Sequence, residues 1–304
     1  MGISQYLKEI GRGKQGARPL SREQAADLFG QVLDGAVTDL EVGAFCLAMR
    51  IKGETAQEMG GFLDATATRL NHLPASERPL VVLPSYNGAR KLPVLTPLLA
   101  LLLARRGLPV LIHGTATESG RITVEPVLQA LGIAPLAGIR AVAPGEAAFV
   151  ATELLCPGLK RLLDARRVIG LRNSAHSLVK LMNPCAGPAV IVSSYTHPEY
   201  GESMAAVFEL MGSTALLLRG TEGEVVADAR RMPQMDGFVR GQRVTLQQGQ
   251  KGTLTALPDL PREIDAQSTA IYIQDVLEGR KPVPASLALQ VEHILHLAQS
   301  VSTS

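Results

Sequence analysis

The stretch VVLPSYNGARKLPVLTPLLALLLARRG, which runs from Val81 to Gly107, decides the fold that this sequence predicts. Its pattern is typical of a buried strand, then a tight turn at Ser85–Gly88, then a buried helix. Such a junction is a common place for a phosphate group, because backbone N–H groups point outward from it. The turn is followed by two cations, Arg90 and Lys91, so the sequence raises the question of which anion it holds.

The same alternation continues through residues 80–304. Apolar runs of strand length, such as VVLP, LPVLIHG, AVIVSSY and ALLLRG, are separated by segments with helical spacing. A series of this kind places helices over a sheet whose strands run mostly parallel. We therefore expect an α/β domain with a mixed, mostly parallel sheet over residues 80–304.

Residues 1–75 predict a smaller, all-helical domain. Ser21 and Gln24 fit a capping box at the start of one helix, and Gly35 ends that helix. Two further helices follow in the same segment. The helix-like segment 172–184 interrupts the α/β series, and we expect it to join the helical domain near the domain junction.

Composition excludes several classes of protein. Tryptophan is absent and aromatic residues make up 4% of the chain, which argues against an aromatic platform for reading single strands. The net charge is +2, so any affinity for nucleic acid must come from a local patch. The three cysteines have no metal-binding spacing, and neither a signal peptide nor a membrane-spanning apolar run is found. We expect a cytoplasmic protein that does not enter a membrane.

Three motifs carry a family resemblance: HGTA at His113, RNSAHSLVKLMNP at Arg172 and RGTEGE at Arg219. Together with the helical N-terminal segment, they make the chain resemble anthranilate phosphoribosyltransferase over nearly its whole length. That enzyme belongs to the class III nucleoside phosphorylases, or glycosyltransferase family 3. The resemblance implies a phosphoribosyltransferase-like fold and a homodimer formed through the helices of residues 1–75.

The departures from the family pattern concern the groups that hold its substrate. Where the family has a Gly-Thr-Gly-Gly-Asp loop for pyrophosphate, this chain has Ser85–Ala89, with one glycine and no acid. The family's Lys-His-Gly-Asn-Arg becomes Ile112–Ala116, and its magnesium-binding Asp-Glu pair falls at Val225 and Val226. We therefore expect neither a metal nor a cofactor. The motifs SYNGARK, RNSAHSLVKL and RGTEGE resemble a divergent branch, described as lacking anthranilate transfer and as binding DNA and RNA without sequence preference.

The residues expected to bind phosphate lie in the 86–91 turn, in the HGTA motif and in the 172–184 segment. They are Tyr86, Asn87, Gly88, Arg90, Lys91, His113, Gly114, Arg172, Asn173, His176 and Lys180. Arg172 and Lys180 are about two helical turns apart, so they would share one helix face with His176 between them. Beside the 86–91 turn, that face would form a positive groove at the domain junction.

Other basic positions have plainer interpretations. A second basic set comprises Lys160, Arg161, Arg166, Arg167 and Arg219. A solvated helix face explains the first four about as well as a binding surface does. The N-terminal cluster from Lys8 to Arg22, which includes Lys14, fits a flexible solvated arm slightly better than a contact surface.

Two further alternatives concern single motifs. The 86–91 turn also fits a plain surface turn with solvated charges. Glu222, Glu224 and Asp228 could hold a metal in principle. The loss of the family's acidic pair favours a structural or solvated role for these three carboxylates.

Two functions remain open from the sequence. The first is a homodimer that binds DNA and RNA through phosphate contacts, without catalytic residues, and with a small anion or nucleotide in the old substrate pocket. The second is a phosphoribosyltransferase or phosphorylase, which is a pentosyl or glycosyl transfer enzyme, with an altered substrate. Salt-dependent binding of oligonucleotides would favour the first, and release of pyrophosphate would favour the second.

Overall fold

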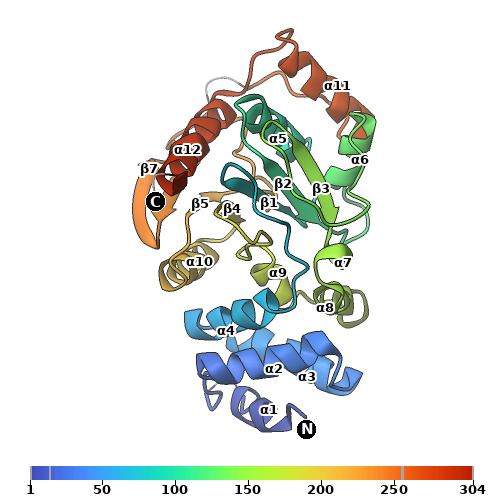
Figure 1. Ribbon diagram of the computed structural model, residues 1–304, viewed down its shortest axis with the longest axis vertical. Coiled ribbons are helices and arrows are strands. Elements are labelled where there is room, and N and C mark those ends of the chain that lie inside the picture. The colour runs from blue at the N-terminus through green and yellow to red at the C-terminus, as the bar shows by residue number, and fades with distance from the viewer. Residues whose placement is uncertain (1, 14, 255–256, 303–304) are drawn as a thin grey trace. The chain divides into compact units, whose positions relative to one another are not determined.

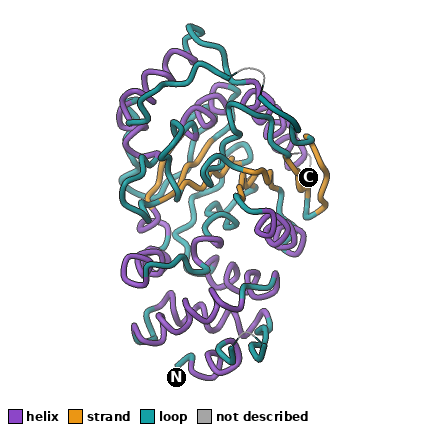
Figure 2. The backbone as a smooth tube through the Cα atoms, turned by 180° about the vertical axis from the view of Figure 1, so that it is seen from behind, coloured by secondary structure: helices purple, strands orange, loops and turns teal. Residues whose placement is uncertain are grey.

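The structure is a computed structural model that describes residues 2–13, 15–254 and 257–302, arranged in two compact units. The helical unit comprises Met1–Asn71 and Thr152–Pro184. The α/β unit comprises His72–Ala151 and Cys185–Ser304. Figure 1 labels the elements of both units, and Figure 2 shows the strands of the α/β unit gathered in one layer.

Three long helices of the helical unit begin where the local sequence provides a side-chain cap. Its helices are α1 (Ser4–Ile10), α2 (Arg22–Asp34), α3 (Asp39–Lys52), α4 (Ala56–Ala67), α7 (Thr152–Leu155), α8 (Pro157–Ile169) and α9 (Ala175–Leu178). Ser21, Thr38 and Thr55 each accept a hydrogen bond from the backbone N–H three residues later, and the Gln or Glu there bonds back. The capping box predicted at Ser21 is thereby confirmed. Gly35 ends α2 in the left-handed conformation, with a φ of 69°.

Three aromatic rings form the centre of this unit. Phe29 of α2, Phe45 of α3 and Phe62 of α4 are fully buried. The Phe29 and Phe62 rings stack at 4.6 Å between centroids, and Phe45 meets both edge-on at 6.1 and 5.9 Å. Both geometries are favourable for aromatic pairs, so the cluster holds the three helices together.

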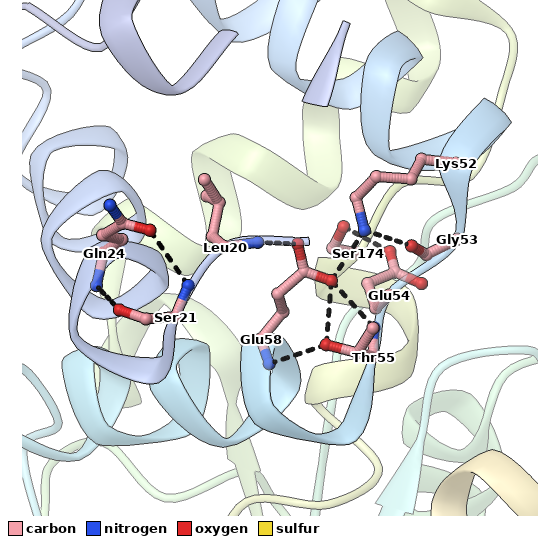
Figure 3. A network of polar contacts seen from close by, with 9 residues as sticks. All are labelled: Leu20, Ser21, Gln24, Lys52, Gly53, Glu54, Thr55, Glu58 and Ser174. Atoms are coloured by element: carbon pink, nitrogen blue, oxygen red, sulfur yellow. Dashed lines mark hydrogen bonds and ion pairs between the residues drawn. The ribbon is translucent and has the colours of Figure 1, made fainter. Parts of the chain in front are cut away.

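A buried carboxylate, Glu58, ties the start of α4 to two other segments (Figure 3). Its Oε2 accepts hydrogen bonds from Lys52 Nζ at 2.6 Å and from the Thr55 backbone and hydroxyl at 2.9 and 3.0 Å. Its Oε1 accepts from the Leu20 backbone at 2.9 Å. Glu58 is 0% exposed, so this ion pair and its capping bonds lie inside the unit.

The second segment of the helical unit is longer than the segment 172–184 expected from the sequence. It begins at Thr152, because α8 buries Leu159, Leu162 and Leu163 and packs against α2 and α3. The helix predicted across 172–184 is wrong in its extent, since α9 covers only Ala175–Leu178. One reason is local: the Asn173 side chain accepts the Ala175 N–H at 3.1 Å, which stops the helix from extending toward Arg172.

The α/β unit contains the mixed, mostly parallel sheet that the sequence predicts. Its strands are β1 (Leu80–Ser85), β2 (Val110–Gly114), β3 (Ala147–Ala151), β4 (Ala189–Tyr195), β5 (Ala215–Arg219), β6 (Met235–Val239) and β7 (Gln242–Gln247). They lie in the order β3-β2-β1-β4-β5-β6-β7, with parallel pairing up to β5 and antiparallel pairing beyond it. The carboxyl ends of β1 and β5 therefore lie at the same edge of the sheet.

Helices cover both faces of this sheet (Figure 1). The helices are α5 (Thr96–Arg105), α6 (Val124–Ala130), α10 (Pro198–Leu210), α11 (Ala266–Leu277) and α12 (Ala285–Ser302). α5 and α12 pack on one face with α6 and α11 beside them, and α10 packs against β4 and β5 on the other. Buried Leu98, Leu103, Ile112 and Val192 belong to one apolar core between α5 and the sheet.

The cysteines bear on nucleophilic chemistry, and the helices bear on whether the chain can cross a membrane. Cys46, Cys156 and Cys185 are buried. Burial raises the pKa of the Cys46 thiol to about 11 and also raises the pKa of Cys156, so both stay protonated near neutral pH and are poor nucleophiles. Among the helices described, none is both long and apolar enough to cross a membrane.

Candidate functional site

The turn after β1 sits at the carboxyl edge of the sheet and is more buried than the sequence suggested. Tyr86 and Asn87 are 3% and 7% exposed. Gly88 has a φ of 65°, and a Cβ there would lie 2.7 Å from the Ile122 carbonyl oxygen. Glycine is therefore required at this position by both backbone conformation and space. The side chains of Arg90 and Lys91 are exposed.

A carboxylate from elsewhere in the chain fills the inner part of this turn. Glu224 is 2% exposed and lies in the segment after β5. Its Oε1 accepts hydrogen bonds from the backbone N–H groups of Asn87 and Gly88 at 3.1 and 2.9 Å. Its Oε2 accepts from the hydroxyls of Ser85 and Thr96 at 2.6 and 3.0 Å. The Glu224 carboxylate thus takes the place that an anion from outside would need.

A second carboxylate fills the outer part. The Oε2 atom of Glu222 accepts three consecutive backbone N–H bonds, from Arg90, Lys91 and Leu92, at 3.1, 3.0 and 3.2 Å. In the conformation observed, the two carboxylates occupy the backbone donors that the sequence predicted to meet phosphate. The donors are engaged because the segment after β5 folds over the turn after β1.

The positions of the family's metal pair are apolar and buried. Val225 and Val226 are 0% and 3% exposed. Burial acts to raise the pKa of the Asp228 carboxyl, but its partner Arg230, at 2.8 Å, outweighs burial and holds that pKa below its usual range. Across the described part of the chain, no cluster of three or more His, Cys, Asp or Glu side chains could hold a metal ion.

His113 and Gly114, at the end of β2, have structural roles in the α/β unit. His113 is fully buried, its Nδ1 lies 2.8 Å from the Tyr86 hydroxyl, and its Nε2 has no hydrogen-bond partner among the described residues. Burial lowers the pKa of His113 to about 3, so it is neutral at physiological pH. A Cβ on Gly114 would lie 1.9 Å from the Ser85 carbonyl oxygen, so glycine is needed for strand packing.

Three cations lie near His176 in the helical unit: Arg172 and Lys180 of the RNSAHSLVK segment, and Arg166 of α8. Burial, followed by the charges of Arg172, Arg166 and Lys180, lowers the pKa of His176 to about 3. The His176 Nδ1 lies 3.3 Å from the Asn173 backbone nitrogen, and in the described part of the chain its Nε2 has no hydrogen-bond partner. His176 therefore adds no positive charge at neutral pH, although it lies among basic side chains. Arg172 and Lys180 do not share a helix face, because only α9 is helical between them.

The other basic positions are dispersed. Lys160 forms an ion pair with Asp164, Arg167 lies 3.6 Å from the same carboxylate, and Arg161 donates to the Leu33 carbonyl at 2.8 Å. Arg219 ends β5 with an exposed side chain. Of the N-terminal arm, Arg12 pairs with Glu9 and Arg22 with Asp64, while Lys14 lies outside the described residues.

The sequence did not identify the two carboxylates as ligands of the turn. It favoured a structural or solvated role for Glu222 and Glu224 over a metal site, without naming the groups that they bind. The signal available was indirect: acids follow β5 in a parallel sheet, while the family's own acid is missing from the turn after β1. The acids after β5 fill the turn from which the family's acid is missing.

Comparison with known proteins gives one consistent family. Residues 4–69 match the helical bundle domain of a glycosyl transferase family. An uncharacterized protein of Escherichia coli (strain K12), YbiB, is 42% identical over 96% of this chain and 92% of its own length. An anthranilate phosphoribosyltransferase of Methylobacterium nodulans is 26% identical over 91% of this chain and 82% of its own length.

A solved structure shows the same fold. The anthranilate phosphoribosyltransferase of Thermus thermophilus superposes with a TM-score of 0.74, at 22% identity, over 98% of this chain and 89% of its own. That identity supports the fold alone, and the match to YbiB establishes close kinship. The chain therefore belongs to one family with Escherichia coli YbiB, and its fold is of the anthranilate phosphoribosyltransferase-like, glycosyltransferase family 3 type.

Proposed function

We propose that this protein binds DNA and RNA without sequence preference, through contacts to phosphate groups, on its phosphoribosyltransferase-like scaffold. One observation carries the proposal: Glu224 and Glu222 occupy the backbone donors of the 86–92 turn, while the side chains of Arg90 and Lys91 are exposed. A turn closed in this way cannot wrap a diphosphate with its backbone. Exposed cations can still contact a phosphodiester from outside.

The helical unit supplies a second group of cations. Arg166, Arg172 and Lys180 lie close enough to His176 for their charges to act on its pKa. Their positive potential would attract a phosphate backbone regardless of base sequence. His176, whose buried Nε2 has no partner among the residues that the structure describes, also gives this segment a polar atom for a small anion or nucleotide.

Removing one lysine from each unit should weaken binding to all oligonucleotides about equally. Lys91→Ala combined with Lys180→Ala deletes two candidate phosphate contacts. Each deleted contact should flatten the plot of log affinity against log salt concentration by roughly 0.7 to 0.9. Fluorescence anisotropy with labelled single strands and duplexes of several sequences, at several salt concentrations, measures both quantities.

A matched lysine provides the control for that measurement. Lys281 belongs to the α/β unit and is paired with Asp259 at 2.6 Å, so Lys281→Ala should keep the parent's salt slope. If the parent shows no binding at low salt, the proposed function fails. If the double variant keeps the parent's affinity and slope, the binding surface lies elsewhere, and the Lys8–Arg22 arm is the next candidate.

A transferase or phosphorylase with an altered substrate is the second candidate. It is supported by the fold, which matches an anthranilate phosphoribosyltransferase over 98% of this chain. Against it stand the two carboxylates in the turn and the buried valines at the metal position. Release of pyrophosphate from phosphoribosyl pyrophosphate and magnesium by pure protein, with anthranilate or another acceptor, would establish this candidate instead.

We also propose that the protein forms a homodimer through the helical unit. α3 carries an apolar stripe, which we define as Leu40, Ala44, Leu47 and Ile51, spaced at helical intervals. Leu40, Leu47 and Ile51 are 84%, 47% and 59% exposed. An exposed apolar helix face of this kind is typical of a surface that a second copy covers.

A charge in the apolar stripe should prevent dimer formation. Leu47→Glu would place an unpaired carboxylate in the interface, so a dimeric parent should become monomeric at micromolar concentration. Light scattering gives the mass directly. Ile271→Glu is the matched control, because Ile271 is 49% exposed but lies on α11 of the α/β unit, and it should leave the mass unchanged. A monomeric parent would rule out the homodimer.

A further inference from the structure

The backbone N–H groups of Arg90, Lys91 and Leu92 form a small anion site, which we call the Arg90–Leu92 nest. All three point at one oxygen atom, Glu222 Oε2, at 3.0 to 3.2 Å. Consecutive N–H groups that converge in this way bind anions, and nearby cations strengthen the binding. Two exposed cationic side chains, those of Arg90 and Lys91, belong to the nest residues themselves.

The two carboxylates of the turn differ in how firmly they are held. Glu224 is 2% exposed and accepts from four donors, including two buried hydroxyl groups, so it is a fixed part of the core. Glu222 is partly exposed, and the hydrogen bonds that its carboxylate accepts from described residues are the three from the nest. Its carboxylate can therefore leave the nest for water without leaving a buried hydroxyl unsatisfied.

The backbone conformation of Glu222 also favours replacement of its carboxylate in the nest by another anion. Its φ is 54°, a left-handed conformation that is unfavourable for a residue with a side chain, and Gly223 follows with a φ of 89°. The nest bonds help to hold Glu222 in this conformation. A competing anion in the nest would remove that restraint.

We propose that Glu222 is a displaceable internal anion that closes a phosphate site, and that a phosphate group takes its place in the Arg90–Leu92 nest. The phosphate can belong to a nucleic-acid backbone or be free in solution, because the N–H donors recognise only the phosphate oxygens. That the phosphate is part of DNA or RNA rests on the proposed function. The existence of the gated site does not.

The gate can be tested with inorganic phosphate as the probe. The backbone amide resonances of Arg90, Lys91 and Leu92 report directly on the nest. In Glu222→Ala they should shift saturably with phosphate, at concentrations on the order of tenfold lower than in the parent, because a charge-assisted competitor has been removed. Glu222→Gln, which keeps the side-chain shape, should show a smaller change in the same direction, and it serves if the alanine variant does not fold.

Glu125→Gln is the control for simple loss of negative charge. Glu125 is partly exposed and lies three residues after Ile122, whose backbone pairs with Ala89 of the turn, yet among the described residues its carboxylate accepts from Gln129 and not from the nest. Its substitution should leave the phosphate response of the nest amides at the parent's level. If Glu222→Ala responds no better than the parent or than Glu125→Gln, the gate is overturned.

Oligonucleotides then distinguish the two sources of phosphate. If the ligand is a nucleic acid, Glu222→Ala should bind labelled oligonucleotides more tightly and steepen the salt slope by about one contact, roughly 0.7 to 0.9. A nest that responds to inorganic phosphate without tighter oligonucleotide binding supports the gate and rejects nucleic acid as its occupant. In that case the proposed function would be judged by the lysine variants alone.

Discussion

Glu58→Ala is expected to lower the free energy of unfolding by about 3 to 5 kcal/mol, because it leaves a buried ammonium group without its carboxylate. The Lys52 and Glu58 side chains are 9% and 0% exposed. The substitution also removes the acceptor for the N–H groups of Leu20 and Thr55 (Figure 3). Each unsatisfied buried donor adds to the loss. Denaturant unfolding of the purified variant measures the difference.

A second pair on the same helix provides the control. Asp64 of α4 binds Arg22 in a two-pronged contact at 2.6 and 2.8 Å, but their side chains are 42% and 31% exposed. Asp64→Ala should therefore cost about 1 kcal/mol or less. A Glu58→Ala variant that is no less stable than Asp64→Ala would show that the buried pair does not stabilise the helical unit.

Acidification from about pH 7 to about pH 5 is expected to lower the free energy of unfolding by about 4 kcal/mol, about 2 for each of His113 and His176. The pKa of each is about 3 in the folded chain, against an ordinary value of 6.5. Burial is the main cause in both. Between these values the unfolded chain binds protons that the folded chain does not. The stability that the two neutral histidines contribute is therefore fully present above the pKa of the unfolded chain, and it is lost as the pH falls below that value.

The measurement is the free energy of unfolding by denaturant across this pH range, since most carboxylates titrate below it. Glutamine does not titrate. His113→Gln and His176→Gln should therefore each remove about half of the change in unfolding free energy with pH, whatever they do to stability at neutral pH. His197→Gln, at an exposed histidine, is the control and should leave the change in unfolding free energy with pH as it is in the parent. A parent with equal stability at both ends of the range would contradict the prediction.

Much of the fold could be predicted because its signals lie within a few residues of one another. The capping box at Ser21 joins residues three positions apart, and Gly35 ends its helix through its own backbone conformation. The alternation of strands and helices predicted the mostly parallel sheet for the same reason. The helix expected over 172–184 failed because Asn173 bonds to the nearby Ala175 N–H, a local competitor that periodicity does not register.

The sequence by itself determined the layered fold, the start of the helix capped by Ser21, and the loss of the glycines and acids that hold the family's substrate. Only the tertiary structure decided that the turn after β1 is closed. Glu224 and Asn87 are 137 positions apart, and Glu222 and Arg90 are 132 apart. They meet because β1 and β5 run parallel, so the segments that follow them emerge at one edge of the sheet. Hydrogen bonds over such separations depend on strand order, which no local pattern encodes.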